Sequence, residues 1–237
     1  MSQTLYFLNE SSLAFPDLSF ALSEPNGLLA LGGDLTPERL VEAYANGIFP
    51  WYSDDEPIMW WSPDPRAIIP TDEIYINKTL RKFLKKSSYK VTVNKAFNDV
   101  IAYCADAPFR TEETWIVDDM MKAYRQLHQL GHAHSIEVWQ DDRLVGGLYG
   151  VAINGFFSGE SMFYKASNAS KIALISLAQL LKDQGLTFID CQINNPFLES
   201  MGAIEISRDE FVRLKQKAIN TMVPDNVWLP RQLYLPL

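Results

Sequence analysis

Residues 155–192, GFFSGESMFYKASNASKIALISLAQLLKDQGLTFIDCQ, decide the fold of this chain. They divide into an apolar strand, GFFSGESMF, a helix of about four turns, SNASKIALISLAQLLKDQ, and a second apolar strand, TFIDCQ. A strand–helix–strand unit crosses over with a right hand and lays its two strands parallel in one sheet. We therefore expect residues 155–192 to place the two strands side by side or nearly so.

Two carboxylates interrupt these apolar strands near corresponding ends, Glu160 in the first and Asp190 in the second. Because side chains alternate along a strand, Asp190 and Gln192 should share a face, as should Glu160, Ser158 and Met162. A buried carboxylate must be hydrogen-bonded, paired or protonated, and burial raises its pKa, as a general base requires. Strand position alone leaves the alternative of two structural acids open.

The hydrophobic content of 47% is that of an ordinary globular protein. The length of 237 residues allows one large or two small domains. Acidic residues outnumber basic ones 29 to 21, so a nucleic acid would need a local basic patch. Cys104 and Cys191 lie far apart without a CxxC motif, and His132 and His134 have no third ligand nearby. We expect two reduced thiols and no metal site.

The N-terminus, MSQTLYFLNE, has neither a basic start nor an uninterrupted apolar run. No stretch approaches the roughly 18 apolar residues that a membrane span needs. The expectation is a cytoplasmic protein without a membrane partner.

Residues 1–70 are rich in turn formers and predict a small N-terminal α/β domain, with residues 71–237 forming the second domain. Thr36, Pro37 and Glu38 predict the start of a helix over 37–46, which Gly47 ends.

Aromatic residues crowd the proline-rich segment that follows, and they are Phe49, Trp51, Tyr52, Trp60 and Trp61. Rings on rigid loops suit stacking on a base or a cation. Packing in the core is the alternative for any one of these side chains.

The segment 77–86, NKTLRKFLKK, predicts a helix with one cationic face. The basic side chains on that face are Lys78, Arg81, Lys82, Lys85 and Lys86, and the opposite face carries Leu80, Phe83 and Leu84. A solvated basic face is the usual alternative. In an otherwise acidic protein, the repulsion among these five charges favours an anionic partner.

Helices over about 95–104, capped by Asn94, and 118–130 precede three antiparallel strands that run into the strand–helix–strand unit. This order is the pattern of the acyl-CoA N-acyltransferase (GNAT) superfamily, so we predict an α+β fold whose second domain is a GNAT-like mixed sheet. Such enzymes hold a pyrophosphate on a glycine-containing loop before the helix. The corresponding loop here, FYKASNAS, has no glycine, which disfavours coenzyme A, although acyl transfer from coenzyme A remains the alternative function.

Several longer strings resemble the leucyl/phenylalanyl-tRNA–protein transferase family over nearly the whole chain, among them EPNGLLALGGDLTPERL, AYANGIFPWYS, WWSPDPR, LVGGLYGVA, GESMF and IDCQ. The resemblance implies transfer of Leu or Phe, and less readily Met, from aminoacyl-tRNA to the α-amino group of proteins that begin with Arg or Lys. The product carries an N-terminal degradation signal. No cofactor, ATP or metal is implied, and we expect a monomer.

The resemblance also implies roles for single residues. Asp190 and Gln192 would assist the attacking amine, or position the substrates while the ribose hydroxyls relay the proton, and Glu160 would orient the incoming ammonium. Trp51 and Trp115 would contact the terminal adenine, and the basic helix would hold the acceptor stem by its backbone. The aminoacyl side chain would enter a pocket of Leu148, Phe157, Leu174, Leu177 and Ile189.

That pocket conflicts with regular strand geometry. Phe157 and Glu160 point to opposite faces of a regular strand, as do Ile189 and Asp190. Both members of each pair reach one cavity only if the strands bulge or splay, and we predict such a distortion near Gly159.

Overall fold

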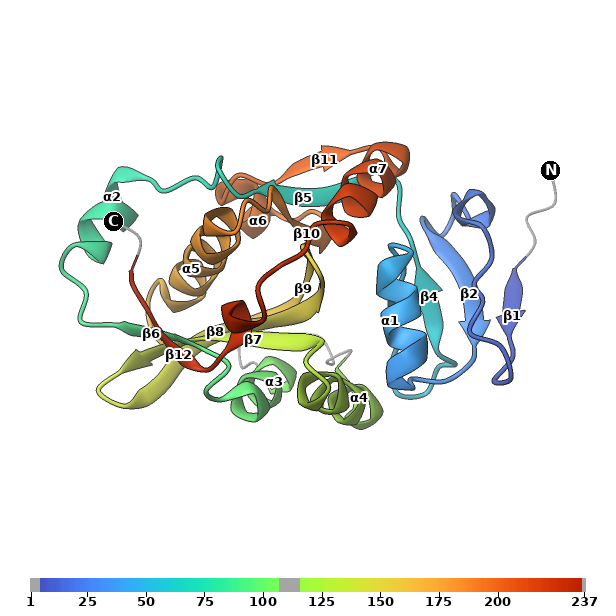
Figure 1. The fold of residues 1–237 in the computed structure, drawn as a ribbon, viewed down its shortest axis with the longest axis horizontal. Coiled ribbons are helices and arrows are strands. Elements are labelled where there is room, and N and C mark those ends of the chain that lie inside the picture. Colours follow the sequence, from blue (N-terminus) through green and yellow to red (C-terminus); the bar gives the residue numbers. More distant parts are fainter. Residues whose placement is uncertain (1–4, 107–115, 236–237) are drawn as a thin grey trace.

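The structure is a computed structural model that describes residues 5–106 and 116–235 (Figure 1). Its strands form two mixed sheets, one of four strands and one of eight, with helices packed around them. The predicted α+β class, with a small N-terminal unit and a larger mixed sheet, is confirmed.

The small sheet holds, in spatial order, β1 (Tyr6–Leu8), β2 (Leu28–Gly32), β4 (Met59–Trp61) and β3 (Phe49–Pro50). Helix α1 (Pro37–Ala45) lies between this sheet and the rest of the molecule (Figure 1). The helix predicted over 37–46 is thus confirmed, with Pro37 at its start and Gly47 following its end at φ +78°.

The large sheet has the spatial order β11 (Ile204–Ile206), β5 (Arg66–Pro70), β10 (Phe188–Gln192), β9 (Phe156–Tyr164), β8 (Arg143–Ile153), β7 (Ala133–Gln140), β6 (Lys90–Val93) and β12 (Arg231–Leu233). Strands β7, β8 and β9 form the predicted antiparallel meander. Strand β10 pairs in parallel with β9, with Asp190 opposite Ser158. The strand–helix–strand crossover predicted over 155–192 is therefore confirmed.

Helices cover both faces of the large sheet: α5 (Ala169–Asp183) lies on one face, and α3 (Phe97–Ala105) and α4 (Asp118–Gln129) lie on the other (Figure 1). A Cβ added to Gly146 of β8 would lie 2.4 Å from the Cβ of Ala169, so this glycine lets α5 approach the sheet. The remaining helices are α2 (Lys78–Leu84), α6 (Pro196–Ser200) and α7 (Arg208–Ile219), with 3-10 turns at Leu18–Phe20 and Asp225–Trp228.

Asn94 does not cap α3, contrary to the sequence-based expectation. The helix begins at Phe97, and Asn94 has a left-handed backbone at φ +54°. Its carboxamide accepts a hydrogen bond from the Ser135 amide and donates one to the Trp228 carbonyl. These bonds to β7 and to the C-terminal segment replace the local cap.

The change from the small sheet to the large one falls between Trp61 and Arg66, before the boundary at residue 70 that the sequence suggested. Strand β5 lies between β10 and β11 in the large sheet, and its apolar run explains this central place. The two parts share one apolar cluster, to which Trp60 and residues of α3 and α4 all belong.

None of the helices within residues 5–106 and 116–235 is long and apolar enough to cross a membrane. In the same ranges, His, Cys, Asp and Glu side chains nowhere gather in a group of three that could hold a metal ion. Cys104 and Cys191 are both free thiols.

Candidate active site

Both strands that carry the predicted acids are irregular at those acids. In β9 the pairing with β8 slips so that Tyr149 faces Ser161 and Gly150 faces Gly159, which leaves Glu160 between them as a bulge. The predicted distortion near Gly159 is confirmed. A bulge re-aims a side chain, and here it turns Glu160 toward a cavity.

Strand β10 carries the matching irregularity. Its pairing with β5 slips between Asp190 and Gln192, which leaves Cys191 without a register partner. Gln192 has a left-handed backbone at φ +57°, an uncommon conformation for a residue with a side chain. Both strands are thus distorted next to their polar side chains.

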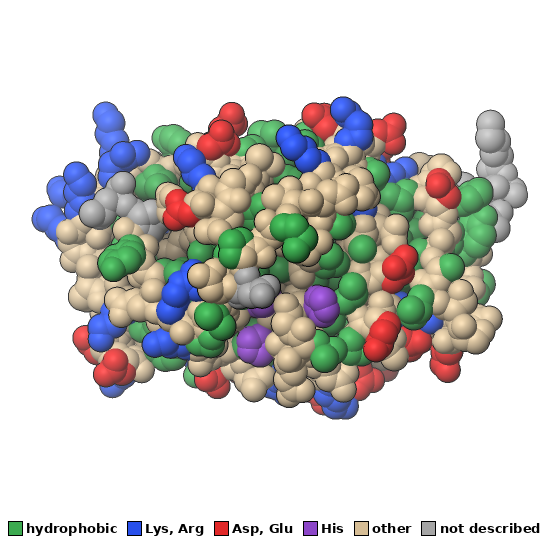
Figure 2. Space-filling model, in the orientation of Figure 1, with side chains coloured by type: hydrophobic (Ala, Val, Ile, Leu, Met, Phe, Trp, Pro, Cys, Tyr) green, Lys and Arg blue, Asp and Glu red, His purple; other side chains and the backbone are tan. Residues whose placement is uncertain are grey.

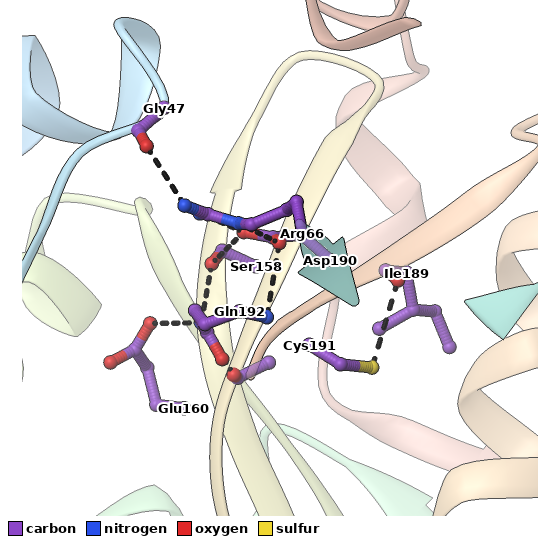
Figure 3. Close-up of polar contacts among 9 residues, drawn as sticks. Gly47, Arg66, Ser158, Glu160, Ile189, Asp190, Cys191 and Gln192 are labelled. Carbon is purple, nitrogen blue, oxygen red and sulfur yellow. Dashed lines mark hydrogen bonds and ion pairs between the residues drawn. The ribbon is translucent and has the colours of Figure 1, made fainter. Parts of the chain in front are cut away.

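Asp190 is fully buried and forms a two-pronged ion pair with Arg66 of β5 (Figure 3). The Arg66 Nε and Nη2 atoms donate to the two carboxylate oxygens, each at 2.8 Å. The third nitrogen, Nη1, donates to the Gly47 carbonyl at 3.1 Å. The guanidinium also lies over the rings of Phe49 and Phe211, at 5.0 and 4.3 Å. Asp190 is therefore held by a rigid cation, away from solvent.

Gln192 joins Asp190 to Glu160 (Figure 3). Its backbone amide donates to Asp190 Oδ1 at 3.2 Å, and its Nε2 donates to Ser158 Oγ and to the Gly159 carbonyl, each at 2.8 Å. The same Nε2 lies 3.3 Å from Glu160 Oε1. Ser158 in turn donates to Asp190 Oδ2 at 2.8 Å. The two acids and the amide named from the sequence form one hydrogen-bonded group.

Glu160 lies partly exposed at the cavity wall, and its Oε2 accepts a hydrogen bond from the Tyr124 hydroxyl at 3.0 Å. The pKa of Glu160 is raised to about 7: burial and the charge of Asp190 raise it, while the hydroxyls of Tyr44 and Tyr124 and the charge of Arg66 lower it. Such a carboxyl group changes protonation near neutral pH, as a general base requires.

A cavity of about 870 Å³ opens beside this group. Its apolar wall includes four of the five residues predicted for the pocket, namely Leu148, Leu174, Leu177 and Ile189. Glu160 and Gln192 form part of its polar wall, and Phe49, Pro50 and Trp51 of the N-terminal unit complete another side. The cavity therefore combines apolar space for a side chain with an acid and an amide.

The three aromatic residues predicted for the site have different outcomes. Phe157 does not line the cavity, because it stays on the regular side of the bulge and its ring stacks on Trp228 at 5.5 Å. Trp51 does line the cavity and is 41% exposed, which leaves its ring open to a ligand. Trp115 lies outside the described residues.

All five basic residues of α2 and its C-terminal end are exposed, while Leu80 and Leu84 are buried. Figure 2 shows the Lys and Arg side chains gathered at the end of the molecule where α2 lies. The cationic face expected from the sequence is present, although the helix itself ends at Leu84.

Arg66, Tyr44 and Tyr124 took no part in the site predicted from the sequence, yet all three bond to its acids or to each other. Arg66 is the one charged residue in the apolar run RAIIP. A lone charge in such a run indicates a buried cation that needs an acidic partner, so this pattern could have revealed Arg66. The two tyrosines are aromatic residues on amphipathic helices, a pattern that predicts burial but no hydroxyl partner.

The mixed sheet thus borders an apolar cavity with an acid and an amide, which are the side chains that a group-transfer enzyme needs beside an apolar substrate. The family model for leucyl/phenylalanyl-tRNA protein transferase matches residues 68–216, and the model for the N-terminal domain of the same enzymes matches residues 33–64. The chain belongs to the leucyl/phenylalanyl-tRNA–protein transferase family and is an aminoacyltransferase.

Relatives with that name cover nearly the whole chain. The transferase of Colwellia psychrerythraea is 62% identical over 98% of this chain and 99% of its own length. That of Shewanella baltica is 51% identical over 99% of both chains, and that of Pseudoalteromonas atlantica is 51% identical over 97% and 98%. Among solved structures, the C-terminal domain (DUF2156) of a proposed lysylphosphatidylglycerol synthetase from Agrobacterium fabrum covers 86% of this chain and 64% of that chain. Its identity of 10% and TM-score of 0.39 are too low to carry an argument.

Proposed function

We propose that this transferase moves Leu or Phe, and less readily Met, from aminoacyl-tRNA to the α-amino group of proteins that begin with Arg or Lys, which creates an N-terminal degradation signal. The observation that carries the proposal is the apolar cavity of about 870 Å³ whose wall includes the Glu160 carboxylate and the Gln192 amide. An apolar pocket separates side chains that differ by one methylene by only about 1–3 kcal/mol, which agrees with acceptance of Leu, Phe and Met.

In this proposal the aminoacyl side chain occupies the wall made by Leu148, Leu174, Leu177 and Ile189, with Phe157 supporting the pocket from behind. The ester carbonyl then lies near Glu160 and Gln192. The ester is already activated, so the enzyme has to position the amine, remove a proton and exclude water.

Glu160 is assigned to the acceptor amine. Its carboxylate binds the incoming ammonium and takes one proton, so that the free amine attacks the ester carbonyl. The new C–N bond forms as the bond to the ribose oxygen breaks, and the second proton of the amine goes to that oxygen as it leaves. A pKa of about 7 leaves a substantial fraction of Glu160 ionised at neutral pH.

Asp190 is assigned a positioning role, the second of the two roles that the sequence left open. Full burial and the ion pair with Arg66 keep its carboxylate from the cavity, while its bonds to Ser158 and the Gln192 amide fix the side chain of Gln192. Gln192 then orients the ester or the amine.

For the tRNA, we assign Trp51 and Trp115 to the terminal adenine and the α2 cations to the acceptor stem. The exposure of the Trp51 ring beside the cavity and the exposure of all five cations support this assignment. Contacts to the backbone alone suit an enzyme that accepts several tRNAs. We further propose that the protein acts as a monomer, and that it acts in the cytoplasm, where aminoacyl-tRNA is made.

The test mixes the purified protein with Leu-tRNA and an Arg-initiated peptide in the absence of ATP. We expect the peptide to gain one leucine at its N-terminus, as detected by mass spectrometry, and an Ala-initiated peptide of otherwise equal sequence to stay unmodified. A parallel reaction with acetyl-CoA tests the alternative donor. Acetylation of the peptide without leucylation would contradict the proposal.

A further inference from the structure

Two tyrosines from separate helices meet behind the Glu160 carboxylate. Tyr44 of α1 and Tyr124 of α4 are 1% and 0% exposed, and their hydroxyl oxygens lie 2.5 Å apart. Tyr124 donates to Glu160 Oε2 at 3.0 Å. A chain of two hydrogen bonds therefore runs from the N-terminal unit to the cavity wall.

The direction of this chain follows from the number of protons. Each phenol carries one hydroxyl proton, and that of Tyr124 goes to Glu160. Tyr124 must then accept from Tyr44 rather than donate to it. The chain runs from Tyr44 to Tyr124 to Glu160, and it is complete when Glu160 is ionised. A buried hydroxyl costs free energy unless it is bonded, so the arrangement couples both phenols to that ionised form.

Glu160 is held from both sides. Its Oε2 meets Tyr124 at 3.0 Å, and its Oε1 lies 3.3 Å from Gln192 Nε2. Among titratable and charged groups, those that act on this carboxyl from the surrounding elements are Tyr44, Tyr124, Asp190 and Arg66. The Tyr124 bond is the shorter of these two direct bonds.

We propose that Tyr124, oriented by Tyr44, is a positioning residue that holds the Glu160 carboxylate at the cavity wall, ready to accept the ammonium of the acceptor. The inference rests on the proposed function, in which Glu160 receives that proton. It also gives α1, which carries Tyr44, a part in the reaction.

The experiment compares Tyr124→Phe and Tyr44→Phe with the wild type in profiles of kcat/KM against pH for leucyl transfer. Removing the Tyr124 donor disfavours the carboxylate, so the acidic limb should move to higher pH by roughly one unit, with about tenfold slower transfer below the limb. Tyr44→Phe should move the limb in the same direction, because the Tyr44 hydroxyl also favours the ionised carboxylate. All three proteins should converge at pH 9.

Tyr89→Phe is the matched control. Tyr89 is another buried tyrosine, and its hydroxyl donates to the Ser167 carbonyl at 3.3 Å, outside the group around Glu160. Its limb should coincide with that of the wild type. An equal loss of rate at every pH in Tyr124→Phe would indicate a merely structural role and would overturn the inference.

A second measurement does not depend on transfer. In protein labelled with ¹³C at the glutamate carboxyls, the signal that Glu160→Gln removes belongs to Glu160, and its titration should move to higher pH in Tyr124→Phe. A wild type that transfers no leucine refutes the proposed function but leaves this titration readable. An unmoved titration in the variant refutes the inference even if transfer is normal.

Discussion

Arg66 and Asp190 form the rigid centre of the site at the scale of single residues. Removing two charges from water is expensive, and their mutual attraction offsets that cost only where the remaining donors and acceptors are also satisfied. Here Ser158 and the Gln192 amide bind the carboxylate, and Gly47 binds the guanidinium. The pair therefore joins four segments of the chain at one point: β5, β9, β10 and the turn at Gly47.

Asp190→Ala should destabilise the protein by about 3–5 kcal/mol, because it leaves the Arg66 guanidinium buried without its counter-charge. Urea unfolding followed by tryptophan fluorescence measures the change. The double variant Arg66→Met with Asp190→Leu, which removes both charges, should be more stable than Asp190→Ala. If the single variant unfolds at the urea concentration of the wild type, the ion pair is not the structural anchor.

Glu160 should make stability depend on pH with a definite sign. Its pKa is raised in the folded protein from 4.5 to about 7, so the folded state holds this proton more tightly than the unfolded state does. The stability that the proton confers is complete below pH 4.5 and is lost as pH rises to 7. Glu160→Gln removes this loss, so relative to wild type it should gain about 1–3 kcal/mol between pH 4.5 and 8.

Urea midpoints of both proteins at pH 4.5, 6 and 8 measure this prediction. Glu199→Gln is the control. It also replaces a single acid by its amide, but at an exposed position. A constant difference between wild type and Glu160→Gln across the three pH values would show that Glu160 does not titrate in this range.

At the scale of elements, the bulges in β9 and β10 decide what the strands present to the cavity. Once the resemblance had assigned Phe157 and Ile189 to the pocket, the alternation of side chains predicted an irregularity near Gly159, because one regular face cannot hold both these residues and the acids. The pocket role of Phe157 came from the resemblance and not from strand geometry, and in the structure its ring lies against that of Trp228. Pairing rules show that a strand must deviate, but which side chains then turn inward depends on the packing behind the sheet.

The cationic face of α2 gives a prediction at this scale. Lys85→Ala with Lys86→Ala should weaken binding of all aminoacyl-tRNAs alike, and the slope of log K against log salt should fall by about 1.5, since two phosphate contacts are lost. Filter binding at several salt concentrations measures both effects. Arg213→Ala with Lys217→Ala, which removes two exposed cations from α7, is the charge-matched control and should leave affinity and slope nearly unchanged. Equal losses in the two double variants would mean that net charge, not α2, governs binding.

At the scale of the whole molecule, the last turn of α1 joins the two sheets through the site. Tyr44 bonds to Tyr124, the Ala45 carbonyl accepts from the buried Lys215 of α7, and the Gly47 carbonyl accepts from Arg66. These partners come from α4, α7 and β5, far away along the sequence. Local patterns predicted the helix and its buried side, but they contain no information about which distant hydroxyl or cation meets it. The long-range half of the site therefore could not be predicted from the residues near it.

Gly47→Ala tests whether the contacts made by the end of α1 hold the active site in place. Gly47 has φ +78°, where a side chain is strained, and a Cβ there would lie 2.8 Å from Cε1 of the Phe211 ring. Gly131 has nearly the same backbone, φ +81°, but its Cβ would meet nothing within 4 Å, so Gly131→Ala carries the strain without the contact.

We expect Gly131→Ala to reduce the free energy of unfolding by about 1 kcal/mol and to leave leucyl transfer intact. Gly47→Ala should cost more and slow transfer severalfold, because pushing the turn from Phe211 moves both the carbonyl that Arg66 binds and the Tyr44 hydroxyl. Equal unfolding midpoints and equal transfer rates for the two alanine variants would show that the active site tolerates displacement of α1, and the N-terminal unit would then contribute only its binding surface.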